Sequence, residues 1–180
     1  IRIGLLGCGR IAVRHAELLG KRQIDDACLA AVCDIRPERA ATLAQKHDVP
    51  AFDSLDAMLS GADLDAVAVL TPSGMHADHA VSTLRAGKHA IVEKPMALTL
   101  ADADRMVIAA HEAKRHLLVV KQNRFNVPVV KAREALDAGR FGQLVLGTVR
   151  VRWCRDQLYY DQDRWRGTWA MDGGVVANQA

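Results

Sequence analysis

The sequence predicts an α/β protein in which a parallel β-sheet is covered by helices on both faces. Two observations support this fold class: β-type apolar runs alternate with helical patterns up to about residue 120, and these runs are almost continuously apolar. A third observation concerns the chain after residue 120: five of the eight aromatic residues follow residue 150. We therefore predict a first domain at residues 1–121 and the incomplete N-terminal part of a second domain at residues 122–180.

The first domain is expected to alternate strands and helices in the order typical of a parallel sheet. Pro37 suits the first turn of a helix, and Gly87 suits the position just after a helix end. The expected strands are Ile1–Leu6, Leu29–Cys33, Ala51–Phe52, Ala66–Leu70, Ala90–Val92 and Leu117–Val120. The expected helices are Ile11–Leu19, Pro37–His47, Leu55–Leu59, Met75–Arg85 and Leu100–Arg115.

The pattern changes after residue 122. Val127–Ala138 has the periodicity of a helix that follows Asn126 and ends near Gly139. Leu144–Val151 alternates and contains β-branched residues, so we predict a strand there. A polar, aromatic-rich stretch then runs to Trp169.

Composition excludes several classes of protein. Half of the 180 residues are hydrophobic, a quarter are charged and the formal net charge is +3, which argues against disorder. No block of basic residues indicates nucleic-acid binding, and no apolar run of about 20 residues indicates a membrane span. The four cysteines show no metal-ligand spacing, and the first residues do not form a secretory signal. We expect a cytoplasmic protein without a bound metal.

A glycine-rich sequence predicts a dinucleotide site. Residues 7–12 read G-x-G-x-x-A, directly after the first expected strand and at the start of a helix. Gly7 allows a tight turn, Gly9 lets the backbone approach a pyrophosphate, and Ala12 permits close packing of helix on strand. The free N–H groups at the helix N-terminus favour phosphate.

The acidic residue after the second strand bears on the choice of cofactor. Asp34 stands where a carboxylate usually binds the ribose hydroxyls, and it would repel a 2′-phosphate. Arg36 could instead accommodate that phosphate, or it could be a solvated charge. We predict NAD as the cofactor, with NADP as the less favoured alternative.

Two further loops follow strands of the same sheet. Thr71-Pro72-Ser73-Gly74-Met75-His76 lies where ligands bind in open α/β sheets. His76 could contact cofactor or substrate, or be an ordinary residue of the first helical turn. Glu93-Lys94-Pro95 ends the next strand, and a cis peptide before Pro95 is rare but allowed. There Lys94 could bind a substrate hydroxyl and assist its deprotonation as hydride leaves.

These elements together resemble the glucose-fructose oxidoreductase/inositol dehydrogenase/MocA family. The resemblance is carried by Gly7-x-Gly9-x-x-Ala12, Thr71-Pro72 with His76, Glu93-Lys94-Pro95-Met96-Ala97 and Gly173-Gly174. It implies a Rossmann domain followed by an α/β domain with a large open sheet, and an oligomer when full length. It also implies hydride transfer between a nicotinamide cofactor and a sugar or polyol carbon, with Lys94 as the catalytic residue.

A narrower resemblance is to the WlbA/WbpB group, which oxidises C3 of UDP-N-acetylglucosaminuronic acid in the synthesis of surface polysaccharides such as lipopolysaccharide. It is carried by Gln122-Asn123-Arg124-Phe125-Asn126-Val127-Pro128, Trp153-Cys154-Arg155, Tyr159-Tyr160 and residues 165–174. An anionic substrate suits arginines, and Arg124, Arg155, Arg164 and Arg166 are candidates. Trp165 or Tyr160 could stack on a sugar or nicotinamide face, or the Trp residues could be sheet core.

The resemblance supplies a full set of expected site residues. For the cofactor these are Gly7, Gly9, Arg10, Ile11, Asp34, Arg36, Thr71, Pro72, Ser73, His76, Glu93, Gln122, Trp165 and Arg166. For the substrate they are Lys94, Arg124, Asn126, Tyr160, Thr168 and Asn178.

One position departs from the family pattern. Asn178 stands where the family usually has Asp, and a neutral amide cannot be a general base, so we expect it to orient substrate. The family's His, four residues further on, falls beyond Ala180. We expect the 180 residues to bind NAD but to turn over poorly. The alternatives are another sugar or inositol dehydrogenase of the family, and a regulator that senses NAD(P) without catalysis.

Overall fold

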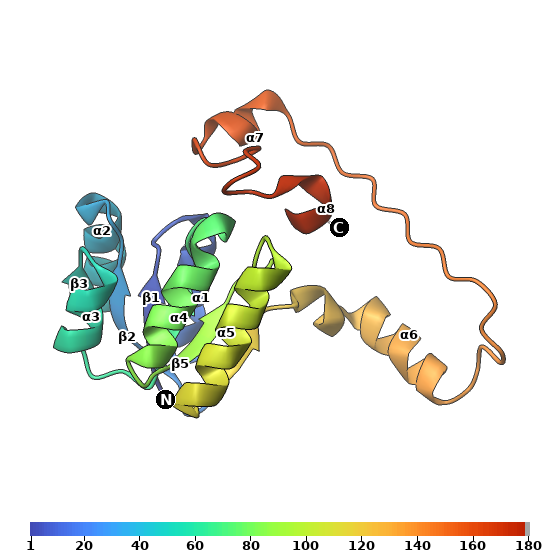
Figure 1. Ribbon diagram of the computed structural model, residues 1–180, viewed down its shortest axis with the longest axis horizontal. Helices are drawn as coiled ribbons and strands as arrows, with labels where there is room; N and C mark the ends of the chain where they lie inside the picture. Colours follow the sequence, from blue (N-terminus) through green and yellow to red (C-terminus); the bar gives the residue numbers. More distant parts are fainter. Residues whose placement is uncertain (179–180) are drawn as a thin grey trace.

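The computed structural model describes residues 1–178, which form a parallel sheet with its helices, followed by a less compact segment (Figure 1). The sheet has six strands in the order β3-β2-β1-β4-β5-β6, and every neighbouring pair is parallel. The strands are β1 (Arg2–Leu6), β2 (Cys28–Cys33), β3 (Ala51–Phe52), β4 (Ala66–Val69), β5 (His89–Val92) and β6 (Leu117–Val119). The predicted α/β class with a parallel sheet is therefore confirmed.

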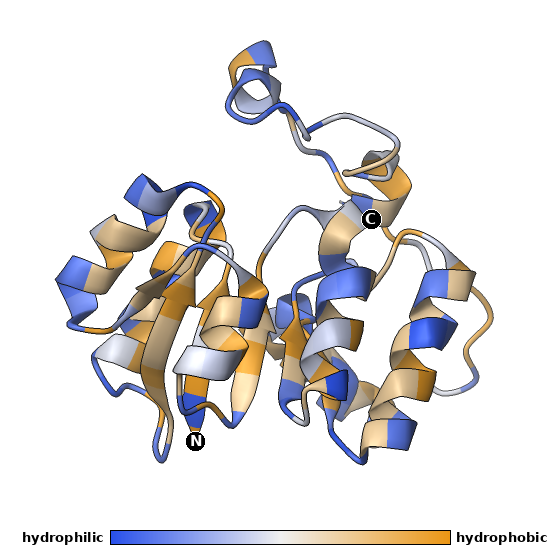
Figure 2. Ribbon diagram, turned by 60° about the vertical axis from the view of Figure 1, so that its left-hand side comes forward, coloured by the Kyte–Doolittle hydropathy of each residue, from blue (hydrophilic) through white to orange (hydrophobic). Residues whose placement is uncertain are grey.

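Helices cover both faces of this sheet. Those of the first 121 residues are α1 (Arg10–Gly20), α2 (Pro37–His47), α3 (Leu55–Gly61), the 3₁₀ helix η1 (Ser73–Met75), α4 (His76–Arg85) and α5 (Leu100–Ala113). Buried residues of α1 and α2 pack on one face, and those of α3, α4 and α5 pack on the other. Figure 2 shows the resulting pattern, with apolar strands inside and polar helix surfaces outside.

Local chemistry explains the ends of these helices. Pro37 stands in the first turn of α2, and Asp48 ends that helix in a left-handed conformation. The side chains of Ser54 and Thr99 cap α3 and α5 by accepting hydrogen bonds from backbone N–H groups. Gly87 has φ of +75° just beyond α4, as its predicted role requires.

The chain after residue 121 leaves the sheet and returns to it. It contains η2 (Gln122–Phe125), α6 (Val127–Asp137), α7 (Gln157–Asp161) and α8 (Gly174–Asn178). In Figure 1, α6 lies beside the sheet, a long connection follows it, and α7 and α8 lie above the carboxyl ends of the strands. This return brings residues 153–178 over the end of the sheet where the predicted site residues lie.

The predicted strand at Leu144–Val151 is not formed within the described residues. Its side chains are exposed, including Val145 and Val149 at about nine-tenths of their surface. An alternating sequence makes a strand only when a neighbouring strand accepts and donates its backbone hydrogen bonds. No described strand lies beside this segment, so the pattern is present without the pairing.

Candidate functional site

The glycine turn after β1 has the geometry expected of a phosphate-binding loop. Gly7 has φ of +95°, and a Cβ added there would lie 2.9 Å from the carbonyl oxygen of Leu70. Gly9 caps α1 with extended backbone and no side-chain hydrogen bond, and an added Cβ would meet nothing within 4 Å. Gly7 therefore serves the turn, whereas Gly9 leaves open the space before the first N–H groups of α1.

Asp34 is fixed in position by two backbone N–H groups. Its Oδ2 accepts a hydrogen bond of 2.7 Å from the N–H of Cys8, and its Oδ1 accepts one of 2.8 Å from that of Arg36. The residue is 9 % exposed, so the carboxylate cannot swing freely into solvent. Each oxygen has a further lone pair, which suits the two hydroxyls of a ribose.

His76 connects two loops at the carboxyl edge of the sheet. The residue is 1 % exposed; its Nδ1 lies 2.7 Å from the carbonyl oxygen of Pro95, and its Nε2 lies 2.8 Å from that of Thr71. Burial lowers the pKa of His76, while the two carbonyls and Glu93 oppose this shift. His76 therefore positions the backbone beside Pro95, although it also borders the cavity as predicted.

Lys94 lies at the end of β5 before a cis peptide bond to Pro95. Its Nζ donates to the carbonyl oxygen of Asn178 at 2.6 Å and lies 3.1 Å from Oδ1 of the same residue. The Nδ2 of Asn178 in turn donates to Asp172. The predicted catalytic lysine is thus held by α8, 84 residues further along the chain.

Gly173 and Gly174 make this contact with α8 feasible. Both have positive φ, +77° and +80°. A Cβ added to Gly173 would lie 2.5 Å from the side chain of Leu98, and one added to Gly174 would lie 2.7 Å from the ring of Trp169. The glycine pair therefore permits both the turn and the close packing that bring Asn178 to Lys94.

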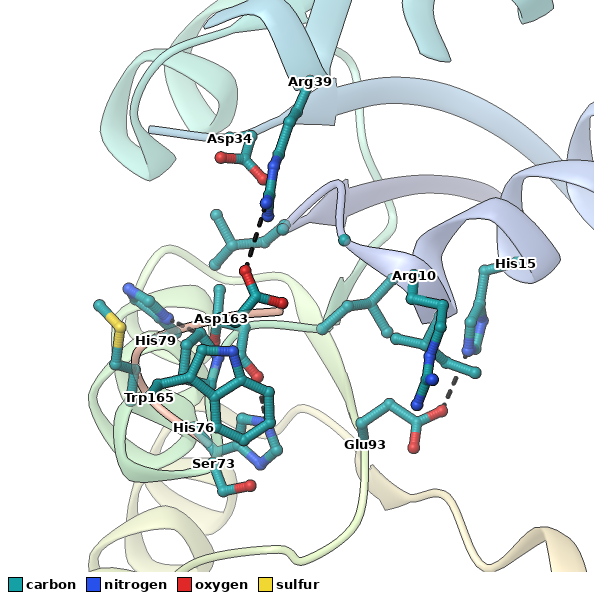
Figure 3. Close-up of a pocket in the computed structure, with 18 of the residues that line it drawn as sticks. Arg10, His15, Asp34, Arg39, Ser73, His76, His79, Glu93, Asp163 and Trp165 are labelled. Carbon is teal, nitrogen blue, oxygen red and sulfur yellow. Dashed lines mark hydrogen bonds and ion pairs between the residues drawn. The ribbon is translucent and has the colours of Figure 1, made fainter. Parts of the chain in front are cut away.

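The sequence analysis missed His15, which lies on α1 beside the predicted site. Its Nε2 is 3.1 Å from Oε1 of Glu93 (Figure 3). The Oε2 of Glu93 accepts from the N–H of Lys94 at 3.2 Å. Burial raises the pKa of Glu93, but the contacts with His15 and Lys94 outweigh it and hold that pKa below its ordinary value. The available signal was helical spacing, because His15 follows Ile11 by four residues and both border the cavity.

An arginine and aromatic cluster forms the opposite wall. The guanidinium of Arg166 lies 4.6 Å from the ring centre of Tyr159 and 4.7 Å from that of Trp165. Its Nη1 donates to the hydroxyl of Tyr159 at 2.8 Å. Arg10 and Arg155 approach the same tyrosine ring at 5.5 and 5.0 Å. These contacts join the glycine turn to the returning segment.

A cavity of about 740 Å³ lies between these walls, within the usual size of small-molecule sites. Every residue expected to contact the cofactor borders it, as do Lys94 and Asn178. Four expected substrate contacts are not brought to it in the described part of the chain: Arg124, Asn126, Tyr160 and Thr168. Arg124 and Asn126 are exposed, Tyr160 packs edge-on against Tyr159, and Thr168 donates to the carbonyl of Trp165. Their contact with substrate stays a prediction.

The residues present fit a bound dinucleotide. Open space before the N-terminus of α1 suits a pyrophosphate, and the carboxylate of Asp34 suits a ribose at one side of it. Within residues 1–178 no cluster of acidic, histidine and cysteine side chains could hold a metal ion. No helix of the described residues is both long and apolar enough to span a bilayer.

Comparison with known proteins assigns the fold to a family. Residues 1–121 match the GFO/IDH/MocA oxidoreductase family, described as an NAD-binding Rossmann fold. The match covers more than half of the chain, and the chain belongs to this family.

Two solved structures and one curated relative show which members it is similar to. The WlbA dehydrogenase of Bordetella pertussis, in complex with NADH and UDP-GlcNAcA, is 43 % identical over all of this chain and 55 % of its own, with a TM-score of 0.95. That of Chromobacterium violaceum, with the same ligands, is 44 % identical over all of this chain and 52 % of its own, also at 0.95. Myo-inositol 2-dehydrogenase of Thermotoga maritima is 35 % identical over 79 % of this chain and 42 % of its own. The chain thus spans about half the length of the relatives it matches.

Proposed function

We propose that this chain is the cofactor-binding part of an NAD-dependent dehydrogenase that oxidises the C3 hydroxyl of UDP-N-acetylglucosaminuronate. One observation carries the proposal: Lys94 borders the same cavity as the glycine turn and Asp34, at the edge of the sheet where ligands bind. The lysine is oriented through Asn178. A hydroxyl-binding cation and a dinucleotide site therefore share one cavity.

The cofactor's proposed position follows from the residues that would hold it. The N-terminus of α1 beyond Gly9 would bind the pyrophosphate, and Asp34 would bind ribose hydroxyls. Trp165 and Arg166 would form the wall over it. When bound, NAD supplies the acceptor for the hydride that leaves the substrate carbon.

Lys94 would bind the substrate hydroxyl and polarise it. A lysine ammonium has three N–H groups, and within residues 1–178 its contacts are all to Asn178, so at least one N–H is left for a substrate oxygen. A positive charge beside that oxygen stabilises the negative charge that develops as its proton leaves. Asn178, as a neutral acceptor, would hold the ammonium in place without taking the proton itself.

The similarity to the two WlbA dehydrogenases supports the substrate class. Both are solved with UDP-GlcNAcA, and both are similar over the whole chain. The wall formed by Arg10, Arg155 and Arg166 suits a substrate with a carboxylate and a diphosphate. A place in the synthesis of surface polysaccharides follows from this substrate and is part of the proposal.

Turnover by the full-length protein tests this function. NADH formation is measured with UDP-N-acetylglucosaminuronate, myo-inositol and glucose in parallel, and activity with the first alone is expected. Inositol dehydrogenases are among the relatives, at 35 % and 36 % identity, so myo-inositol is the main alternative substrate. Activity with myo-inositol alone would refute UDP-N-acetylglucosaminuronate as the substrate.

A lysine variant tests the chemistry. Lys94→Met should abolish turnover and leave NAD⁺ affinity within a few-fold, because the lysine acts on the substrate. Lys131→Met is the matched control, since Lys131 is exposed on α6 and, within the part of the chain that the structure describes, pairs with Glu134 alone. A Lys94→Met protein that retains every activity would favour the NAD-sensing regulator instead.

A further inference from the structure

An ion pair joins the returning segment to the Rossmann domain at the edge of the cavity. The Nη2 of Arg39, in the first turn of α2, lies 3.2 Å from Oδ1 of Asp163, 124 residues further along the chain. The two side chains are 35 % and 20 % exposed, so the pair is partly shielded from water. Figure 3 shows Asp163 reaching from one side of the cavity toward Arg39 on the other.

This ion pair lies at the end of the cavity where a ribose is expected. Arg39 follows Asp34 by five residues, and Figure 3 draws both side chains in the same part of the site. Both border the cavity together with Asp163. The Oδ2 of Asp163 is also 3.9 Å from the Nε of Arg166, so arginines face this carboxylate from both segments.

The charges here disfavour a phosphate on the ribose. A 2′-phosphate needs a cation, and Arg39 is the partly buried candidate, since Arg36 is exposed. Arg39 already donates to Asp163, so a phosphate would have to displace one carboxylate while lying close to a second, Asp34. An uncharged ribose hydroxyl meets no such repulsion.

We propose that Asp163 is a second determinant of NAD over NADP, acting with Asp34 by keeping Arg39 neutralised. The inference deepens the proposed NAD site and rests on it. It assigns to the segment after residue 150 a part in recognising the adenosine end of the cofactor. It also requires that Arg39 becomes a phosphate ligand once Asp163 is neutral.

The test compares the affinities of the full chain for NAD⁺ and NADP⁺ by isothermal titration calorimetry. Asp163→Asn keeps the shape of the side chain and removes its charge, so NADP⁺ should bind on the order of tenfold more tightly relative to NAD⁺. Asp161→Asn is the matched control, because Asp161 lies two residues away, accepts a hydrogen bond from Gln157 alone among the described residues, and should leave the ratio unchanged. In an Arg39→Ala background, Asp163→Asn should no longer raise NADP⁺ affinity.

Other outcomes overturn the inference. If Asp163→Asn changes both affinities by the same factor, Asp163 holds the returning segment in place and does not determine cofactor specificity. If the gain for NADP⁺ persists without Arg39, the phosphate is bound elsewhere. If the unaltered chain binds neither cofactor, the proposed NAD site itself is wrong, and if it prefers NADP⁺, the specificity proposal fails while the dinucleotide site stands.

Discussion

Replacing Gly9 with Asp should stabilise the protein and abolish its binding of NAD⁺. Gly9 occupies the N-cap of α1 with φ of −78° and ψ of −167°, a conformation open to any residue, and a side chain there would enter open space. The helix has no side-chain cap and no acidic residue in its first turn. An aspartate would supply both at the position where we expect the pyrophosphate.

The two effects can be estimated from general values. A better cap, a favourable charge at the helix N-terminus and a less flexible unfolded chain together contribute about 1 kcal/mol. In a protein of this size that corresponds to a melting temperature higher by roughly 2–4 °C. A carboxylate beside the pyrophosphate costs several kcal/mol, so NAD⁺ affinity should fall by at least about a hundredfold.

Thermal unfolding and calorimetric titration of NAD⁺ measure the two effects separately. Gly9→Asn is the control for charge, because asparagine caps helices as well as aspartate does but carries no charge to repel phosphate. Gly7→Ala should lower the stability where Gly9→Asp raises it. The φ of +95° at Gly7 and the 2.9 Å approach of an added Cβ to the carbonyl of Leu70 should cost about 2 kcal/mol of stability. Unchanged NAD⁺ binding by Gly9→Asp would show that the pyrophosphate does not lie at this helix.

Three further predictions concern the other walls of the cavity. His15→Leu removes two of the contacts that lower the pKa of Glu93 while its burial remains, so that pKa should rise relative to the unaltered protein; an NMR titration of that carboxyl checks this. Burial lowers the pKa of His76, so its contribution to stability is complete above the ordinary value of 6.5 and is lost as pH falls through the lowered pKa. The melting temperature should therefore fall on acidification, with a smaller slope in His76→Gln. Gly173→Ala would meet the side chain of Leu98 at 2.5 Å and displace α8, so turnover should fall with NAD⁺ affinity retained.

The sheet could be predicted from the sequence because its signals are local. Pro37–His47 agrees with the prediction at both ends, since Pro37 fixes the start of α2 and Asp48 in a left-handed conformation fixes its end. The buried strands are short apolar runs, and the glycine turn lies directly between β1 and α1. Leu144–Val151 shows the limit of such signals, because a strand also depends on a partner that its own sequence does not specify.

The contacts that complete the cavity were beyond sequence analysis for a related reason. His15 meets Glu93 across 78 residues, and Arg39 meets Asp163 across 124. Each side chain alone is an ordinary charge on a helix or loop. The first pair forms where α1 meets the end of β5, and only the second depends on the return of residues 153–178 over the sheet. The resemblance to a known family identified positions such as Trp165, but not which side chain of the Rossmann domain each one faces.

The first 121 residues and the returning segment contribute different parts of the site, and this bears on how the substrate and cofactor sites are coupled. In the described residues, the carboxylate of Asp34 and the backbone at the start of α1 are held by residues of the first 121, so the phosphate and ribose contacts should form without the returning segment. Lys94 belongs to the same sheet, but its ammonium is held by Asn178, and Arg39 is neutralised by Asp163. On the proposed function, the returning segment would thus orient the cation proposed as catalytic at one end of the cavity and set the charge at the other. If both proposals hold, a change in the position of this segment should alter catalysis and cofactor choice together and leave the proposed pyrophosphate site unchanged.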